Sequence, residues 1–405
     1  MLSTRGATLY QGFMAIADGA SDYFSPWTYN TPMVVKVETN AGLHRVQQSM
    51  MKCIRHFVEQ YDSYRELMPV TDKIYDVLSL CRHKPYRIGT YRTDFVLDEA
   101  KQIKLIEITC RFALNGFFTS GFLLRLAERY LADKPHITKI DDYTPFYDDL
   151  MAYFWEFDHV CLLKGADNRN ETKFVVSIFE HAGFPVHVIP ADAVSENIHL
   201  FEHAAVIGEL DHNELCRLPF DTIAAIIDAQ SLNDLRTVFL IHDKRFFTLL
   251  THDAFLHAAL SDAEIEELRP YLIPTYTRKL RPDIWEQARR EKDRWIMKPF
   301  ALGKSIDVFA GCVTPEDEWQ SLFTPDRWDK MVLQPFITQP RFRGAVKDQP
   351  HHDYIVGTLL FFEEQYYGPG LFRASSHPVT NKVDDRKVAP LVTADTADFA
   401  EDFML

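Results

Sequence analysis

The amino-acid sequence predicts a mixed α/β fold, and three stretches of the chain carry this prediction. Residues 91–109 alternate in the way that two paired β-strands do, around a polar turn at 98–102. From residue 159 to about 250, short apolar strands alternate with helical segments, which is typical of a small parallel α/β unit. Residues 295–374 contain further strand-like runs. We therefore expect an antiparallel part joined to a parallel part.

The chain has 405 residues, enough for two or three domains or for one elaborated α/β enzyme, and its composition is ordinary for a globular protein, 46% hydrophobic and 25% charged. The formal net charge of −14 and the lack of a basic run argue against a nucleic-acid partner. No apolar stretch reaches the length of a membrane span, and the chain does not open on a signal-peptide core, so no membrane partner is expected. The six cysteines are scattered without a C-x-x-C motif, which favours free thiols and a cytoplasmic location.

The segment before residue 91 is predicted to be mainly helical. Leu43–Glu66 and Asp72–Cys81 have apolar residues at helical spacing, and Met33–Glu38 has the character of a short strand. After the hairpin, Thr119–Leu131 is predicted to be a helix. We expect its N-terminus to point at the end of the second strand, which would be a favourable place for an anion.

The remaining elements follow from the same kind of pattern. In the parallel unit we expect, in order, Val160–Leu163, Glu171–Ala182, Val186–Ile189, Ala204–Gly208, Asp221–Gln230 and, as a last strand, Thr237–Ile241. No G-x-G-x-x-G motif follows its first strand, so a dinucleotide site is poorly supported. Beyond it we expect helices over 243–292 and strands at Trp295–Pro299, Met331–Phe336, Tyr354–Phe362 and Leu371–Ala374, with loops at 338–353 and 376–390.

The predicted hairpin carries charged side chains on one face of its two strands. The register follows if Asp98 and Ile103, which flank the turn, pair with each other. Asp94 then lies opposite Glu107, at roughly 5 Å between their Cβ atoms. Two opposed carboxylates repel each other, so the arrangement needs a compensating cation or a shared proton.

The same register places Arg92 opposite Thr109, beside the two carboxylates. Mg²⁺ takes one or two carboxylates together with phosphate oxygens, so Asp94 and Glu107 are candidate ligands of a divalent metal. The alternative is an ion-pair cluster of Arg92 with the two carboxylates at the sheet surface.

A second candidate site follows Lys298, which ends the apolar strand 295–299. The next residues include Gly303, Lys304 and Ser305, a loop whose backbone N–H groups can cover phosphates while lysines neutralise them. The loop is not a Walker A motif, which needs a glycine where Lys298 stands. A strand followed by an exposed turn is the alternative.

A third candidate is the run KMVLQPFI at residues 330–337, a strand interrupted at Gln334 and Pro335. A proline removes a donor from the strand ladder and marks an edge or a connector. Connectors of this kind often present backbone groups to an adenine ring, and an edge strand is the alternative. Lys244 follows a predicted strand and opens a helix, although lysines at such positions are mostly solvated.

The order of these pieces resembles that of circularly permuted ATP-grasp ligases, the eukaryotic-type glutathione synthetases and bacterial glutathionylspermidine synthetases. The hairpin contains R-T-D-F and then I-E-x-T, where the family has an R-x-D strand and an E-x-N strand. The α/β unit, the D-K pair at Lys244, the Lys298 strand, the VLQPFI connector and GLFRASS follow in the family's order. The resemblance covers roughly residues 85–390 and implies an ATP-grasp fold of permuted order with an inserted parallel unit.

The resemblance also implies roles for single residues. It places Mg²⁺ on Asp94 and Glu107, while Thr109 stands where the family has asparagine, a better ligand. It assigns Lys244 and Lys298 to the phosphates or the purine of ATP.

By the same resemblance, Gln334 and Phe336 line the adenine pocket, Arg92 lies near the acceptor end of the substrate, and Arg373 binds a substrate carboxylate. We expect Arg92, Arg111 and Arg373 to be the cations that hold the substrate and an acyl phosphate. The family's acidic, glycine-rich lid is replaced here by PFALGKSID, which lacks the Glu that usually holds the metals.

The resulting prediction is an ATP-dependent carboxylate–amine ligase that uses Mg²⁺ and forms an amide bond through an acyl phosphate. Its partners are expected to be small molecules, a carboxylate and an amine such as an amino acid or a short peptide, and a homodimer is left open. The alternatives are a noncatalytic nucleotide-binding relative that acts as a partner protein, and a small-molecule kinase.

The domain organisation that we expect has three parts. Helices and the metal-site hairpin at 1–155 form part of the ATP-grasp core, the inserted substrate-binding unit covers 156–245, and the ATP-binding half with lid loops covers 246–405.

Overall fold

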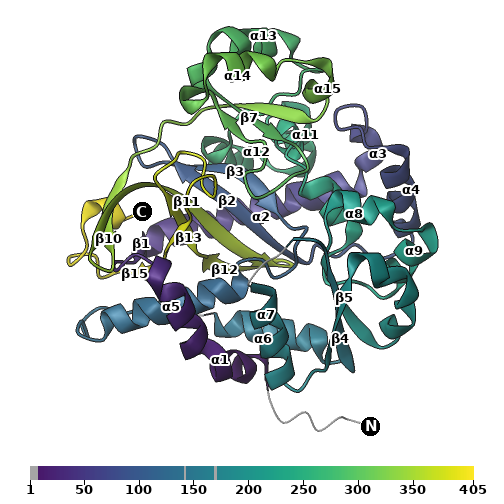
Figure 1. Ribbon diagram of the computed structural model, residues 1–405. Helices are drawn as coiled ribbons and strands as arrows, with labels where there is room; N and C mark the ends of the chain where they lie inside the picture. Colours follow the sequence, from purple (N-terminus) through teal and green to yellow (C-terminus); the bar gives the residue numbers. More distant parts are fainter. Residues whose placement is uncertain (1–7, 141–142, 168–170) are drawn as a thin grey trace.

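The structure, a computed structural model, describes residues 8–140, 143–167 and 171–405 (Figure 1). Its centre is a seven-stranded antiparallel sheet with the order β14-β13-β11-β2-β3, in which β10 and β12 also pair with β11. The strands are β2 (Thr90–Leu97), β3 (Ile103–Thr109), β10 (Phe342–Val346), β11 (Gln349–Phe362), β12 (Gln365–Pro369), β13 (Phe372–Ser375) and β14 (Arg386–Val388). The sheet therefore joins the predicted hairpin to the C-terminal strands.

The predicted hairpin is present, and its register at the charged residues is confirmed. Asp94 pairs with Glu107, and Arg92 pairs with Thr109. Because side chains alternate between the two faces of a strand, all four side chains belong to one face.

The pairing next to the turn differs from the expected one. Leu97 rather than Asp98 pairs with Ile103, and a β-bulge at Ile106 restores the register at the charged residues. Asp98 belongs to the turn because its Oδ1 accepts two backbone N–H groups there, at 3.0 and 2.8 Å. As a result of the bulge, the neighbours Ile106 and Glu107 line the same cavity.

The two faces of the central sheet differ in character. On one face, Tyr91 and Phe95 of β2 join a hydrophobic core with the long helix α2 (Val37–Glu59). On the other face, Arg92 and Asp94 are buried although they are charged. Burial of charge requires compensating partners, so the second face is where a functional site is expected.

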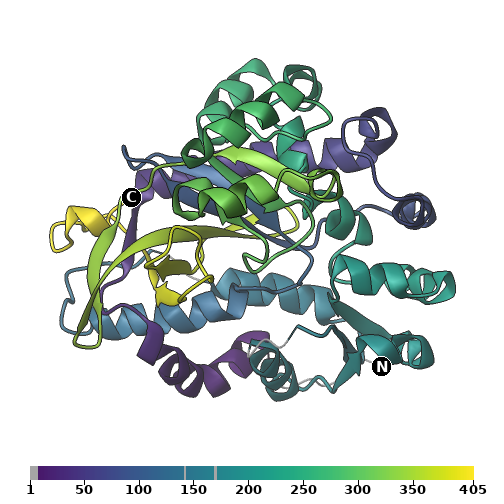
Figure 2. The same ribbon diagram turned by 45° about the horizontal axis from the view of Figure 1, so that its top comes forward.

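Helices α1 (Leu9–Phe24), α5 (Phe117–Leu131), α6 (Thr144–Phe154) and α7 (Glu171–His181) form a second core, which lies below the central sheet in Figure 2. Its side chains meet Leu360 and Phe362 of β11. The N-terminus of α1 is capped by Thr8, which forms a capping box with Gln11.

The predicted parallel unit is present as a three-stranded sheet of order β5-β4-β6. Its strands are β4 (His159–Lys164), β5 (Val186–Pro190) and β6 (Ala204–Glu209), and the helices α8 (His212–Arg217) and α9 (Phe220–Asp228) follow them in the chain. The expected last strand at Thr237–Ile241 is wrong, because these buried residues form a single π-helical turn. A short apolar run fits a buried helix as well as a strand, and the surrounding core decides between them.

A smaller layer stands above the central sheet in Figure 1 and has a core of its own around Trp285, Trp295 and Trp319. It consists of β7 (Trp295–Pro299), β8 (Phe309–Ala310), β9 (Met331–Pro335), α13 (Pro282–Arg290), α14 (Glu316–Ser321) and α15 (Pro325–Trp328).

The other helices and strands of the described chain are β1 (Met33–Lys36), α3 (Tyr61–Tyr64), α4 (Asp72–Cys81), α10 (Phe246–Leu249), α11 (Asp253–Ala259), α12 (Asp262–Leu268) and β15 (Pro390–Thr393). The expected loop at 338–353 is wrong for most of its length, since β10 and the start of β11 form a hairpin there.

Among the helices that the structure describes, none combines the length and the apolar character needed to cross a membrane.

Candidate functional site

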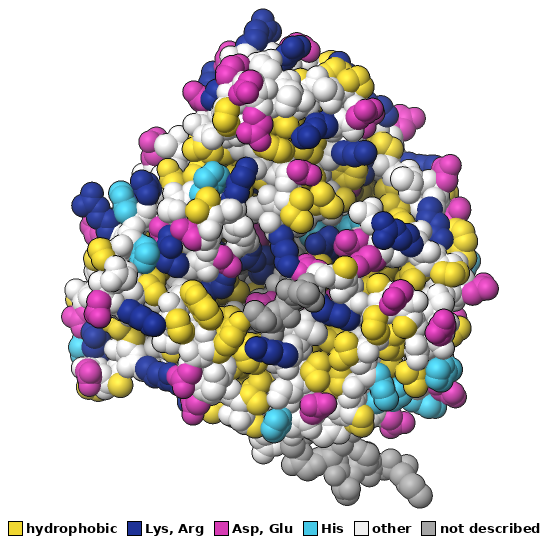
Figure 3. Space-filling view, viewed as in Figure 1, with side chains coloured by type: hydrophobic (Ala, Val, Ile, Leu, Met, Phe, Trp, Pro, Cys, Tyr) yellow, Lys and Arg dark blue, Asp and Glu magenta, His cyan; other side chains and the backbone are white. Residues whose placement is uncertain are grey.

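Two adjoining cavities lie on the charged face of the central sheet. The first is enclosed by the hairpin, by β7 and β9, and by the loops 300–308 and 376–381. The second opens between the hairpin, the end of α1 and the start of α7. Glu107, Lys304 and Arg373 line both cavities and therefore mark their junction. Figure 3 shows a hollow near the centre of this face of the molecule, with Lys and Arg side chains gathered around it.

Asp94 is held by an arginine of its own strand. Arg92 donates from Nε to Oδ1 at 2.7 Å and from Nη2 to Oδ2 at 2.9 Å, and both side chains are only 3% exposed. Burial lowers the pKa of Arg92, but the Asp94 carboxylate outweighs burial and the pKa lies above its ordinary value. Of the alternative, an ion-pair cluster of Arg92 with both carboxylates, the structure contains the pair with Asp94, whereas Glu107 forms its ion pair with Lys244.

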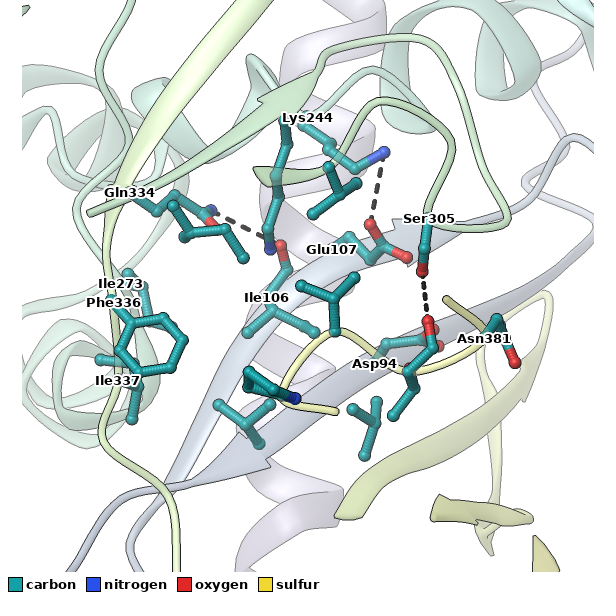
Figure 4. Close-up of a pocket in the computed structure, with 18 of the residues that line it drawn as sticks. Asp94, Ile106, Glu107, Lys244, Ile273, Ser305, Gln334, Phe336, Ile337 and Asn381 are labelled. Atoms are coloured by element: carbon teal, nitrogen blue, oxygen red, sulfur yellow. Dashed lines mark hydrogen bonds and ion pairs between the residues drawn. The ribbon is translucent and has the colours of Figure 1, made fainter. Parts of the chain in front are cut away.

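Glu107 is the counter-ion of two buried lysines. Lys244 Nζ lies 3.3 Å from Glu107 Oε2 (Figure 4) and donates to the carbonyl of Leu302 at 2.7 Å. Burial lowers the pKa of Lys298 to about 8, although the Glu107 charge partly opposes this shift. Burial alone raises the pKa of Glu107, but Lys244 and Lys298 outweigh it, so the carboxyl pKa lies below its ordinary value. A cluster of two cations and one anion has spare positive charge for an anionic ligand.

Next to these lysines the first cavity becomes an apolar slot, lined by Val96, Ile106, Ile273, Ile296, Phe336, Ile337 and Val356. Gln334 supplies polar groups to it. Its Nε2 donates to Thr275 Oγ1 at 2.9 Å, and its buried Oε1 has no hydrogen-bond partner within the described part of the chain. In Figure 4, Gln334, Ile273 and Phe336 lie on one side of the cavity, with Glu107 and Asp94 beyond them. An apolar slot with a free acceptor suits a flat heterocycle that carries an N–H donor.

The loop after β7 covers the junction of the cavities. Lys304, Ser305 and Asp307 adopt φ values of 57°, 57° and 52°, which non-glycine residues rarely do. Side chains of the loop itself contact other segments of the chain. Lys304 forms an ion pair with Asp167, which follows β4, and Ser305 Oγ donates to the carbonyl of Thr380 at 2.6 Å. The side chains of Lys304 and Ser305 are thus engaged with protein groups in this structure.

The second cavity is lined by the remaining predicted cations. Arg111 lies with its guanidinium carbon 4.2 Å from the centre of the Phe112 ring. Burial lowers the pKa of Arg373, and the nearby Arg92 lowers it further. Glu171, at the start of α7, lines the same cavity and accepts a hydrogen bond from Thr119 Oγ1 at 2.7 Å.

The structure brings all of the predicted site residues together around the two cavities. The first is lined by Asp94, Glu107, Lys244, Lys298, Lys304, Ser305, Gln334, Phe336 and Arg373, and the second adds Arg92, Thr109 and Arg111. Their binding roles stay predictions. Sequence reasoning missed Tyr23, Trp27 and Glu171, which come from segments with no polar motif of their own.

Fewer of the predicted metal ligands are free to bind a metal than the sequence predicts. Across residues 8–140, 143–167 and 171–405, no three His, Cys, Asp or Glu side chains lie close enough together to hold a metal ion. Both Asp94 oxygens are engaged by Arg92, and Thr109 offers only a weak hydroxyl ligand. Glu107 is the carboxylate that faces both cavities, and one carboxylate together with nucleotide phosphates is a sufficient set for Mg²⁺.

Comparison with solved structures shows which fold this is. A glutathione synthetase-like effector, GSS30 from Globodera pallida in its apo form, is similar to this chain with a TM-score of 0.57 and 13% sequence identity, over 93% of this chain and 96% of that chain. At this identity the likeness is one of fold, so the protein has a glutathione synthetase-like fold. The sequence model of the AnkG N-terminal domain family matches residues 46–240. No curated protein matches the chain.

Proposed function

We propose that this protein binds ATP in the first cavity and uses it to join a carboxylate to an amine. The observation that carries the proposal is the position of Lys244, Lys298 and Glu107. They lie where an apolar slot meets a second, larger cavity, so a nucleotide in the slot presents its terminal phosphate to a substrate in the other cavity.

In the proposed complex, the adenine ring lies between Ile273, Ile296 and Phe336, and Gln334 Oε1 accepts from its amino group. The phosphates lie against Lys244 and Lys298. Lysines that are buried beside a single carboxylate gain a second counter-ion when a polyanion binds, which favours the nucleotide.

The proposed reaction has two steps. The substrate carboxylate attacks the γ-phosphorus of ATP, which gives an acyl phosphate and ADP. An amine then attacks the acyl carbon, inorganic phosphate leaves, and one proton is released as the amide forms. Arg373 lines both cavities and Arg111 lines the second. In the proposed reaction they stabilise the substrate carboxylate and the acyl phosphate. Glu107 would hold Mg²⁺, which supplies charge neutralisation between the phosphates.

A second candidate is a protein that binds the nucleotide without turnover. Two observations favour it: Asp94 is engaged by Arg92 on both oxygens, and the loop after Lys298 contributes no Glu to the site. A kinase that transfers the phosphate to a small molecule would use the same groups.

The test is calorimetric titration with ATP, with and without Mg²⁺, followed by mass spectrometry of the products formed with a pool of amino acids. We expect Lys298→Ala to weaken ATP binding more than Lys304→Ala, because Lys304 is paired with Asp167. ADP with an amide product supports the ligase, a phosphorylated product supports a kinase, and binding without ADP supports the noncatalytic protein. No ATP binding by the wild-type protein would overturn all three.

A further inference from the structure

The second cavity has an aromatic side that the proposed phosphate chemistry does not use. Tyr23, Phe24 and Trp27 line it, from the end of α1 and the 3-10 turn Ser25–Trp27 that follows. The Tyr23 ring lies 5.2 Å from that of Phe24 and 5.3 Å from that of Trp27, in edge-to-face arrangements, so the three rings form one continuous wall.

Two apolar side chains that line this cavity are largely exposed to solvent. The Trp27 side chain is 48% exposed, and Val383, from the loop after β13, is 68% exposed. Removing such apolar surface from water favours binding in proportion to the area that is covered. A ligand that covers the wall with an apolar group therefore gains binding free energy that a small polar ligand does not.

The wall is held in place before any ligand arrives. Thr28 Oγ1 donates to the Phe24 carbonyl at 2.8 Å, and the Thr28 backbone N–H donates to the Ser25 carbonyl at 3.1 Å. These two hydrogen bonds close the turn that carries Trp27. Phe24 is buried and stacks on Phe122 of α5 at 6.2 Å. A preorganised wall binds without a cost of ordering its side chains.

Glu171 supplies a negative charge to the same cavity. It accepts a hydrogen bond from Thr119, and it forms no ion pair within 4.0 Å with any other residue that the structure describes. Its charge acts on Arg92 and Arg373, so it lies close to the cations at the junction. A carboxylate that accepts one neutral hydrogen bond at the wall of a cavity has room for an ammonium group.

From these contacts we infer that the amine accepted in the second cavity carries a bulky apolar or aromatic group, as an apolar amino acid does. Its ammonium binds at Glu171 and its side chain covers the wall of Tyr23, Phe24 and Trp27. This inference rests on the proposed function, because it names the acceptor of the same site.

The test measures binding of free amino acids by calorimetry, without nucleotide and with saturating ATP. We expect phenylalanine and leucine to bind about 10-fold or more tightly than glycine and glutamine, the scale that one apolar contact contributes to specificity. Trp27→Ala should remove most of this preference. The matched control is Trp155→Ala, because Trp155 is 50% exposed and lines neither cavity.

Two probes of equal carbon skeleton test the ammonium site. Glu171→Gln keeps the hydrogen bond from Thr119 but removes the negative charge. The variant should therefore bind phenylalanine at least 10-fold more weakly than the wild type, whereas its affinity for 3-phenylpropionate, which lacks the amine, should be unchanged. Equal binding of phenylalanine and glycine, or an equal effect of the two tryptophan variants, would overturn the inference. The ATP titration is independent of these variants, so a failure of nucleotide binding overturns the proposed function and leaves the amino-acid preference as a separate result.

Discussion

Arg92 and Asp94 lie two residues apart on β2 and hold each other through two parallel hydrogen bonds, of 2.7 and 2.9 Å, on the polar face of the central sheet. Glu107 pairs with Asp94 across the strands but turns to Lys244 instead. The repulsion expected between the two opposed carboxylates is therefore relieved by two separate cations. This division of partners makes the two carboxylates behave differently when they are mutated.

The first prediction concerns Asp94. Asp94→Asn leaves the Arg92 charge buried with a neutral partner, so we expect a loss of about 3–5 kcal/mol in the free energy of unfolding. Urea denaturation measures it. The double variant Arg92→Met, Asp94→Leu removes both charges and should recover most of the loss. A single variant as stable as the wild type would show that the pair is not structural.

The second prediction concerns Glu107. Glu107→Gln leaves Lys244 and Lys298 without their shared carboxylate, so the melting temperature of the free protein should fall by several degrees. ATP supplies the missing negative charge, and the gap between variant and wild type should narrow when ATP is added. Thermal melts with and without ATP, both in EDTA, test this. A gap that widens with ATP would place the carboxylate in the nucleotide contact itself.

The third prediction is a pH dependence of ATP binding in the absence of divalent ions. Burial lowers the pKa of Lys298 to about 8, so its positive charge is lost as the pH rises through 8 in the free protein. ATP favours the charged form, so its affinity should fall about 10-fold between pH 7 and pH 9, with proton uptake on binding above pH 8. Calorimetry in buffers of different ionisation enthalpy measures both. Lys298→Arg stays charged and should give a flat profile, and a wild-type profile as flat as that of the variant would contradict the prediction.

The fourth prediction is a loss of stability on acidification caused by two buried histidines. His212 and His242 lie with their rings 5.6 Å apart, and burial lowers the pKa of His212 to about 4 and that of His242 well below its ordinary value. The unfolded chain binds more protons than the folded one below pH 6.5, so stability should fall as the pH drops from 6.5 toward 4. The slope should be about 1.4 kcal/mol per pH unit for each histidine. Urea unfolding at several pH values measures this slope. His212→Phe should reduce it, whereas His181→Phe, on the exposed surface, should not.

The order of residues was enough to predict the elements that carry the site. The alternation of β2 and β3 predicted their charged face, and the apolar runs of β4 and β7 predicted strands at nearly the observed bounds. These features depend on interactions between residues that are close in the chain, so the alternation of polar and apolar residues is enough to predict them. The π-helical turn at Thr237–Ile241 was missed because a short buried run has no distinguishing period.

What only the tertiary structure decided is which charges neutralise each other and which apolar groups share a cavity. Glu107 and Lys244 are brought together by the packing of segments that lie far apart in the chain, and so are Trp27 and Glu171. The free energy of a buried charge depends on the partner that the fold supplies, and no local pattern specifies that partner. The sequence by itself therefore determined the strands and the candidate residues, whereas long-range packing determined how their charges are compensated and what the second cavity is shaped to hold.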